Sequence, residues 1–512
     1  MTSLSKYFCS LVPKIFAQRR WVAAIAGLIL AAGASAFVLP NLFPFPDPAG
    51  LSATFSPNGA IDTSNAFFQS LGTNGRSCAT CHVAGDDFGL RATTAQTRFE
   101  QTRGNDPLFT SVDGANCPDG SRHNPADHSL LLRHGLIRVA LTLPSDAEFT
   151  ISTEHDPYGC AIAVDPDSGS QTISVYRRPL PATNLRFLSA VMLDGRETIE
   201  PLSDPKTYHA NLVIDLKHQA LDATLGHAQA AVPPTDAQQT AIVNFEMGLY
   251  SGQLWNTRAD LLSAGSGLGG PYLLSQQEYY PGVNDSLGQD PGGNGFRQNA
   301  FTLFRGWANA SASEAGTPNR LSEEQEEARR EIAAGETIFN SHPLTISEVR
   351  GLNDNPALGK IPVAPFQGTC TTCHDSPNVG NHSLPAPLDI GTGHSAAHEP
   401  DSAIANALSQ LDLPDLPVYE IHGCPDPFAA PGDSKAQVLY TSDPGKALLT
   451  GKCSDLNRIK GPILRGLAAR APYFHSGAAR NLGQVVEFYN QRFQMNLSEA
   501  EKAELVAFLN SL

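Results

Sequence analysis

Apolar residues recur at helical spacing over several stretches of the chain, which predicts a series of amphipathic helices. Helices are expected over 63–71, 184–198 and 208–230, and a longer one over 235–262 with Ile242, Phe245, Leu249 and Leu254 on one side. A charged helix is expected over Glu323–Phe339 and two more within 481–512, where Ser498 and Glu501 form a capping box. The pattern therefore predicts a mainly α-helical protein.

A different pattern lies between about residues 105 and 180. Three short β-like runs, Leu136–Leu143, Glu148–Thr153 and Thr172–Arg177, are separated by Asp, Pro and Gly. We interpret this stretch as a small β-containing insertion. The stretch 263–297 is rich in Gly, Pro, Asn and Asp and is expected to be a loop.

The N-terminus has the pattern of an export signal. Basic residues, an apolar run Trp21–Leu30 and then Ala34-Ser35-Ala36 predict a signal peptide over 1–36. The apolar run is short for a membrane span, although an uncleaved anchor remains an alternative. We expect an exported, periplasmic protein that has no stable membrane span after signal cleavage.

The chain is acidic, with a formal net charge of -16. Residues 1–36 carry four basic side chains and no acidic one, so the exported part would be more acidic still. Such a charge disfavours binding to nucleic acid or to anionic membranes. It suits a basic redox partner, and it equally serves solubility.

Two segments have the spacing that attaches c-type haem. They are Cys78-Ala79-Thr80-Cys81-His82 and Cys370-Thr371-Thr372-Cys373-His374. Two thiols one turn apart can each form a thioether to the porphyrin, and the next histidine can ligate the iron. The spacing predicts two covalently bound c-type haems, with His82 and His374 as iron ligands. A four-cysteine zinc site is the alternative, but the paired histidines and the export signal argue against it.

Four further cysteines remain besides Cys9 of the predicted signal peptide. Because each pair lies within one region of an exported chain, we predict disulfides Cys117–Cys160 and Cys424–Cys453. Four free thiols are the alternative.

Three other segments resemble those of the bacterial di-haem cytochrome c peroxidases and their relatives of the MauG type. They are Val191-Met192-Leu193-Asp194-Gly195-Arg196, the stretch from Leu216 through Gln219-Ala220 to Gln229, and Ala471-Pro472-Tyr473-Phe474-His475-Ser476-Gly477. The resemblance implies two cytochrome c-like haem domains, here 37–320 with the insertion and 321–512. It also allows for one calcium ion between them, although no acidic loop motif identifies ligands.

The second haem differs from that of the peroxidases in its expected ligand. These carry a Met fourteen residues after the histidine of the Pro-Tyr segment, whereas this chain has Tyr489, as in the MauG type. We expect Tyr489 to ligate the iron, which would favour oxidised states. The alternatives are a core role for Tyr489, with Met495 or one of His382, His394, His398 and His422 as ligand.

The first haem lacks the distal glutamate of the family, because Gln229 aligns with it. An amide cannot shuttle the proton of a peroxide, but a histidine can. We therefore assign His227 as the distal acid/base and Gln229 as its orienting partner. His227 could instead be a sixth iron ligand or a structural residue. The histidine that follows His82 is His123, and that long gap favours an open distal side.

Three further positions bear on how the haems are held and connected. Leu193 replaces the tryptophan that relays electrons between haems in the family. Arg196 either supports a haem propionate or pairs with Asp194. His475 either holds a propionate or orders water between the haems.

The resemblance implies an exported di-haem oxidoreductase. It would reduce hydrogen peroxide, or use a high-valent haem as the MauG type does, with a small cytochrome c or a cupredoxin as electron donor. Alternatives are a dioxygen-dependent di-haem oxygenase, like the rubber oxygenases, and a non-enzymatic di-haem electron carrier.

Overall fold

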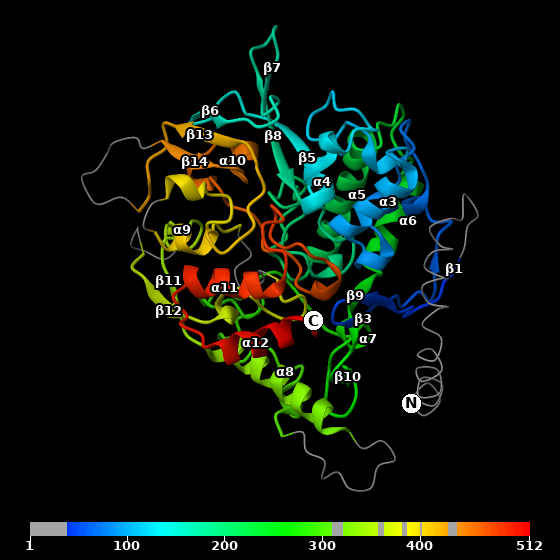
Figure 1. Cartoon of the computed structure of the whole chain (residues 1–512), viewed down its shortest axis with the longest axis vertical. Helices are drawn as coiled ribbons and strands as arrows, with labels where there is room; N and C mark the ends of the chain where they lie inside the picture. The colour runs from blue at the N-terminus through cyan, green and yellow to red at the C-terminus, as the bar shows by residue number, and fades with distance from the viewer. Residues whose placement is uncertain (1–37, 310–320, 357–362, 381–386, 400–401, 429–437) are drawn as a thin grey trace.

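The computed structural model describes residues 38–309, 321–356, 363–380, 387–399, 402–428 and 438–512 (Figure 1). The predicted signal peptide and His382 lie outside these residues. Within them no helix is long and apolar enough to cross a membrane.

The prediction of a mainly α-helical protein is wrong. Only 31% of the structure is helical, and the described residues hold 14 strands in five sheets. Two of the expected helices account for part of the error. The stretch 184–198 forms only a short 3-10 helix, η6 (Leu185–Phe187), and the helix expected over 235–262 ends at Met247. Gly248 caps it, and the chain continues as strand β9 (Tyr250–Asn256), which pairs with β3 (Gly50–Phe55), about 200 residues earlier.

The helices predicted over 208–230 and Glu323–Phe339 and the two within 481–512 form close to their expected positions. The α-helices are α3 (Ala92–Thr102), α4 (Ser129–His134), α5 (Tyr208–Gly226), α6 (Asp236–Met247), α7 (Pro271–Leu274), α8 (Glu323–Ser341), α9 (Ala403–Leu408), α10 (Ala447–Thr450), α11 (Leu482–Arg492) and α12 (Glu499–Leu509). The capping box of Ser498 and Glu501 is confirmed at the start of α12. At 63–71 only η1 (Ala66–Phe68) forms, and Asn65 caps it.

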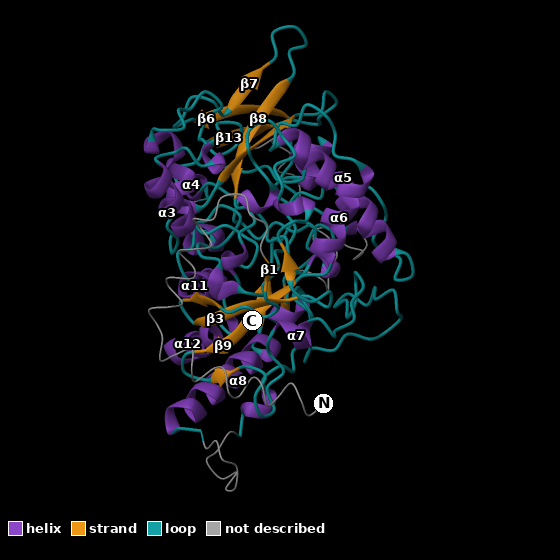
Figure 2. Ribbon diagram, turned by 90° about the vertical axis from the view of Figure 1, so that its right-hand side faces the viewer, coloured by secondary structure: helices purple, strands orange, loops and turns teal. Residues whose placement is uncertain are grey.

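The sheets are small and mostly antiparallel ribbons. The remaining strands are β1 (Val38–Leu39), β2 (Phe45–Asp47), β4 (Ile61–Asp62), β5 (Ile137–Thr142), β6 (Thr150–His155), β7 (Ile162–Val164), β8 (Gln171–Arg177), β10 (Asp260–Leu261), β11 (Leu344–Ile346), β12 (Phe366–Gly368), β13 (Val418–His422) and β14 (Leu439–Thr441). They pair in the orders β10-β9-β3-β2, β14-β13-β6, β5-β8-β7, β1-β4 and β11-β12. The β7–β8 hairpin projects at the top in Figures 1 and 2.

The three predicted β-like runs are confirmed as β5, β6 and β8. They do not form one sheet of their own. Strand β6 pairs with β13, about 270 residues later, whereas β5 and β8 pair with each other. The inserted stretch thus packs directly on the C-terminal part of the chain, and buried residues from both parts form one hydrophobic cluster, including Phe149, Val175, Tyr419 and Leu448.

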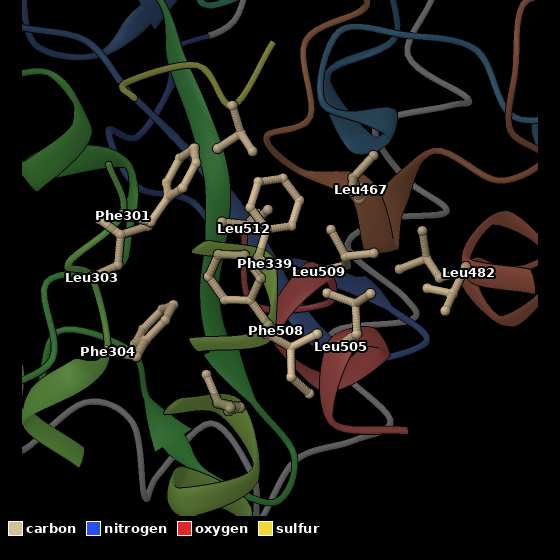
Figure 3. Close-up of a cluster of buried hydrophobic side chains, with 14 of the residues drawn as sticks. Phe301, Leu303, Phe304, Phe339, Leu467, Leu482, Leu505, Phe508, Leu509 and Leu512 are labelled. Carbon is tan, nitrogen blue, oxygen red and sulfur yellow. The ribbon is translucent and has the colours of Figure 1, made fainter. Parts of the chain in front are cut away.

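The largest hydrophobic cluster lies around α8 and α12 (Figure 3). Phe339 of α8 and Phe508 of α12 stack edge to face against Phe301, and Phe304 lies beside them. Each of these rings is at least 96% buried, so together they remove a large apolar area from water. This cluster also contains Cys370 and Cys373 and so supports the second haem motif.

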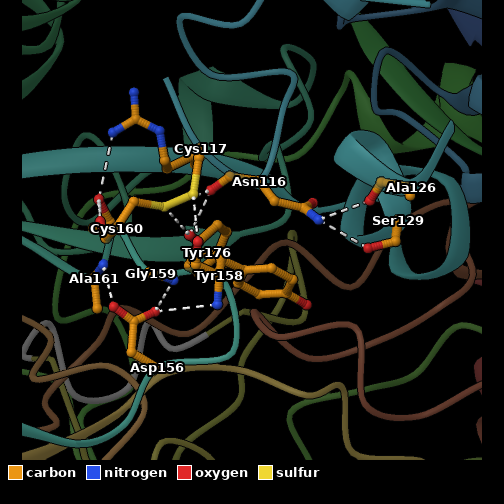
Figure 4. Close-up of a disulfide and its surroundings, with 12 residues drawn as sticks. Asn116, Cys117, Ala126, Ser129, Asp156, Tyr158, Gly159, Cys160, Ala161 and Tyr176 are labelled. Carbon is orange, nitrogen blue, oxygen red and sulfur yellow. Dashed lines mark hydrogen bonds between the residues drawn. A yellow bond between two sulfur atoms is a disulfide. The ribbon is translucent and has the colours of Figure 1, made fainter. Parts of the chain in front are cut away.

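Both predicted disulfides are present, Cys117–Cys160 and Cys424–Cys453. The first disulfide joins the loop before α4 to the loop between β6 and β7 (Figure 4). Around it the Tyr176 hydroxyl donates to the Asn116 carbonyl at 2.6 Å.

Removal of the first disulfide should destabilise the inserted β-structure. Closing a loop of 43 residues restricts the unfolded chain, so we expect Cys117→Ala/Cys160→Ala to lower the free energy of unfolding by about 2–5 kcal/mol. Denaturant unfolding of the variant against the oxidised wild type measures this. A variant as stable as the wild type would mean that the disulfide contributes no stability.

Candidate functional site

The two haem-attachment segments have the same local structure. Each begins with a 3-10 turn, η2 (Cys78–Thr80) and η9 (Cys370–Thr372), and each is preceded by a reciprocal capping box, Ser77 with Thr80 and Thr369 with Thr372. The hydroxyl residues three apart satisfy the free backbone groups of the turn. Both cysteine pairs are free thiols presented from rigid turns.

The histidine that ends each motif is held in the same way. His82 Nδ1 donates to the Phe88 carbonyl at 3.2 Å, and His374 Nδ1 donates to the Val379 carbonyl at 2.9 Å. Both acceptor residues have left-handed backbone, with φ of 54° and 58°, so the chain turns back to the ring. Because a carbonyl only accepts, the proton sits on Nδ1 and Nε2 keeps its lone pair.

Burial also keeps these two imidazoles neutral. It lowers the pKa of His82 and of His374 to about 4, and neutral imidazole is the form that ligates a metal. The second pair of cysteines lies in the α8–α12 cluster, whereas Cys78 and Cys81 pack in two other clusters. The pairs do not converge, so the arrangement does not fit a four-cysteine zinc site.

A cavity opens beside the second motif. Cys370, Cys373, His374, Tyr489 and His475 all line it, and most of its other walls are apolar side chains. Tyr489 lies on α11 and stacks on Phe493, with ring centroids 5.7 Å apart. The cavity thus brings together five of the predicted site residues, from two parts of the sequence about 100 residues apart.

The cavity also bears on the alternative ligands. Met495 lines it together with Tyr489. His394 does not line the cavity, and its two ring nitrogens are hydrogen-bonded to Asp389 and Glu399, each at 2.8 Å. His398 stacks on Tyr440, and His422 lies beside Glu420. Among the described candidates, only Tyr489 and Met495 line the cavity.

Buried cations in the same cavity wall fit a cofactor with carboxylate groups. Arg178, Arg470 and Lys460 all line the cavity, and within the described ranges none of them has an ion-pair partner. Burial lowers the pKa of both arginines to about 10 and that of Lys460 to about 8, which shows how poorly their charges are compensated. The propionates of a haem would supply the missing negative charge, so the residues present fit this group.

Arg196 and His475 are placed differently from these cations. Arg196 donates to both carboxylate oxygens of Asp194, at 3.1 and 2.8 Å, and is not among the residues that line the cavity. His475 does line it, and its Nε2 is buried without a hydrogen bond, 3.8 Å from Asp443. His475 Nδ1 lies 3.5 Å from Thr392 Oγ1, so Nε2 is the ring nitrogen left to bond a group in the cavity.

At the first motif, His227 has a partner that the sequence analysis missed. His227 Nδ1 donates to Asp113 Oδ2 in a short hydrogen bond, and the other carboxylate oxygen pairs with Arg76. Burial would raise the pKa of Asp113, but the bonds from His227 and Arg76 hold it below its ordinary value. Asp113 therefore stays ionised and fixes the proton on Nδ1, and no described residue forms a hydrogen bond with Nε2 of His227.

His82 and Cys81 of the first motif lie close to the Asp113–His227 pair. His227 is near enough to lower the pKa of His82, and Asp113 and Arg76 both act on the Cys81 thiol. The side chain of His227 is 41% exposed, so a small molecule can reach it. Gln229 is more exposed to solvent than His227. Its side chain accepts from Asn74 at 3.3 Å, and Asn74 also donates to the His227 carbonyl at 2.8 Å.

Comparison with known proteins gives three related sequences. The cytochrome-c peroxidase IdrP2 of Denitromonas iodatirespirans is 31% identical over 153 residues, 28% of this chain and 36% of that protein. The cytochrome c551 peroxidase of Nitrosomonas europaea is 34% identical over 119 residues, 21% of this chain and 35% of that protein. The IdrP2 of Pseudomonas sp. (strain SCT) is 28% identical over 150 residues.

The comparisons support a bacterial cytochrome c peroxidase-type family. The chain matches little more than a third of the length of each of these relatives. No family model matches it, and neither does any solved structure.

Calcium does not fit the one cluster of converging His, Cys, Asp or Glu side chains that the described residues contain. Glu197, His218 and Asp222 form it, and His218 Nδ1 is only 2.6 Å from Glu197. Calcium prefers oxygen ligands, and six or more of them, so a histidine with two carboxylates is a poor match. We derive no role for calcium from this cluster.

Proposed function

We propose that this chain is an exported di-haem c-type peroxidase, in which His227 handles the proton of hydrogen peroxide. The observation that carries the proposal is the Asp113–His227 pair beside the first haem motif. The peroxidases among its relatives support the activity, and the duplicated motif geometry supports a haem at each site.

A c-type haem held by Cys78, Cys81 and His82 would supply an iron that binds peroxide and takes up its oxidising equivalents. With Nδ1 committed to Asp113, His227 can use Nε2 to accept the proton of the peroxide and return it to the oxygen that leaves. Asp113 stabilises the imidazolium formed between these two transfers. Gln229 and Asn74 hold the loop that carries His227.

The second site would hold its haem through Cys370, Cys373 and His374, with Tyr489 as a further iron ligand. Arg178, Arg470 and Lys460 would pair with its propionates. A small cytochrome c or a cupredoxin is the proposed electron donor, since the acidic chain suits a basic partner.

The number of haems tests the assignment of the two sites. We expect two covalent haems per chain in the wild type and one in each of the variants Cys78→Ala/Cys81→Ala and Cys370→Ala/Cys373→Ala, because each removes both thioether sulfurs of one site. The pyridine haemochrome spectrum divided by protein concentration measures this. Two haems in either double variant would contradict the assignment.

The activity itself is tested with the loaded protein. It should consume hydrogen peroxide while it oxidises a reduced small cytochrome c. Failure to consume peroxide, with both haems present, would overturn the proposed function.

One observation also fits the alternative function of a non-enzymatic di-haem electron carrier. The free Nε2 of His227, close to His82, is also what an axial ligand would need. In that case the first haem would bind neither cyanide nor peroxide. Cyanide titration of the ferric protein distinguishes the two, because the peroxidase proposal predicts binding at the first haem.

A further inference from the structure

The wall between the two haem sites is built by a segment of the inserted stretch. Directly after β8, residues 178–181 line the cavity of the second site. The Leu180 carbonyl of the same segment lies near enough to the His82 ring to affect its pKa. Gly89, seven residues after His82, lines the same cavity. The two sites therefore share this wall.

Arg178 connects the wall to both haem segments. Its Nη2 donates to the carbonyls of Leu90 at 2.8 Å and of Arg470 at 2.9 Å, and its Nη1 donates to the His134 carbonyl at 3.2 Å. Its backbone N–H donates to the His475 carbonyl at 2.8 Å. Leu90 follows the first haem motif, and Arg470 and His475 belong to the second site.

Gly135 leaves the space that this guanidinium needs. A Cβ on Gly135 would lie 2.7 Å from Arg178 Nη1, and Gly135 has a left-handed φ of 65° that favours glycine. The neighbouring Arg177 is fixed separately, by buried ion pairs with Asp443 and Asp194. Arg177, the last residue of β8, thus forms ion pairs, whereas the next residue, Arg178, bonds backbone carbonyls.

The contacts of Arg178 are all with neutral carbonyls, so its charge is not cancelled by its hydrogen bonds. It lines the cavity beside Arg470, a second cation, and in the part of the chain that is described neither has an ion-pair partner. A cation beside a haem offsets the negative charge of the propionates and so stabilises the ferrous state, which carries one positive charge less than the ferric state.

We propose that Arg178 is a positioning residue with two effects: its forked guanidinium fixes the first haem segment against the second, and its charge raises the reduction potential of the second haem. This rests on the proposed function only in assuming that both haems are bound. Through Arg178 the inserted β-structure would set the relative placement of the two sites.

Two substitutions separate geometry from charge. Arg178→Gln removes the charge, whereas Arg178→Lys keeps it but cannot span three carbonyls with one planar fork. Arg133→Gln is a matched control, since Arg133 is an exposed arginine of the same insertion, next to His134. All three are prepared with both haems, and the signal of each haem is followed by electron paramagnetic resonance (EPR) during a redox titration.

In Arg178→Gln we expect the midpoint potential of the second haem to fall by about 59 mV or more, the one-electron equivalent of a tenfold change in equilibrium constant. In Arg178→Lys this potential should stay near the wild-type value, while the EPR signal of the first haem shifts. The control should change neither property.

An unchanged potential in Arg178→Gln would overturn the role of the charge. A wild-type first-haem signal in Arg178→Lys would overturn the positioning role. If Arg178→Gln does not fold, the EPR signal of the first haem in Arg178→Lys still decides the positioning role. A lowered midpoint potential of the second haem in Arg178→Lys, which keeps the charge, would contradict the role of the charge. Neither readout depends on peroxide turnover, so failure of the proposed function would be seen separately.

Discussion

Replacement of His227 by alanine should slow the reaction with hydrogen peroxide by about 10²- to 10⁴-fold, while haem content stays at the wild-type level. The reason is that Nε2 of His227 is the proposed proton acceptor near the first haem, and its ring is oriented for that role by Asp113. Stopped-flow absorbance of the haem after mixing with peroxide gives the rate constant.

Gln229→Ala provides the matched control for this variant. Gln229 is exposed, and its side chain contacts Asn74 rather than the ring of His227, so we expect less than a tenfold change. If His227→Ala reacted as fast as the wild type, His227 would have no part in the proton transfer. If Gln229→Ala were equally slow, the loop rather than the imidazole would be responsible.

The second large effect is expected for Asp113→Asn. The substitution keeps the volume, but the amide can present an N–H to His227 and so place the proton on the wrong ring nitrogen. In a catalytic triad the corresponding change costs about 10⁴-fold. We therefore expect the peroxide rate constant to fall by about 10²-fold or more. The same rapid-mixing experiment measures it.

This variant also removes the buried partner of Arg76, whose side chain is 3% exposed. Leaving a buried charge unpaired typically costs about 3–5 kcal/mol, so thermal unfolding should be recorded beside the rate. Asp113→Glu is the matched control for charge. It should retain more stability than Asp113→Asn, because a carboxylate remains. A folded Asp113→Asn protein with a wild-type peroxide rate would show that Asp113 does not orient His227.

The fold was predictable where the information is local. The periodicity of Glu323–Phe339 predicted α8 to within two residues, the capping box of Ser498 and Glu501 predicted the start of α12, and the β-like runs became β5, β6 and β8. The expected helix over 235–262 failed because β9 gains its partner from β3, which lies far away in the sequence. Over a run as short as β9, the spacing of apolar residues fits a helix as well as a strand.

The candidate site also has a part that local sequence predicts and a part that it does not. The cysteines and histidines of the two motifs are adjacent in sequence, so their chemistry could be predicted from spacing alone. Asp113 and Arg178 lie in the inserted stretch, and only the tertiary structure brings them to His227 and to the cavity. A pairing across 114 residues leaves no pattern in a single sequence.

A peroxide site beside His227 is tested most directly by the EPR spectrum of the ferric di-haem protein before and after one equivalent of hydrogen peroxide. We expect one high-spin signal, from a first haem with an open distal side, and one low-spin signal from the second haem. Peroxide should abolish the high-spin signal in the wild type within the mixing time, and much more slowly in His227→Ala. Two low-spin signals that peroxide leaves unchanged would contradict a peroxide site beside His227.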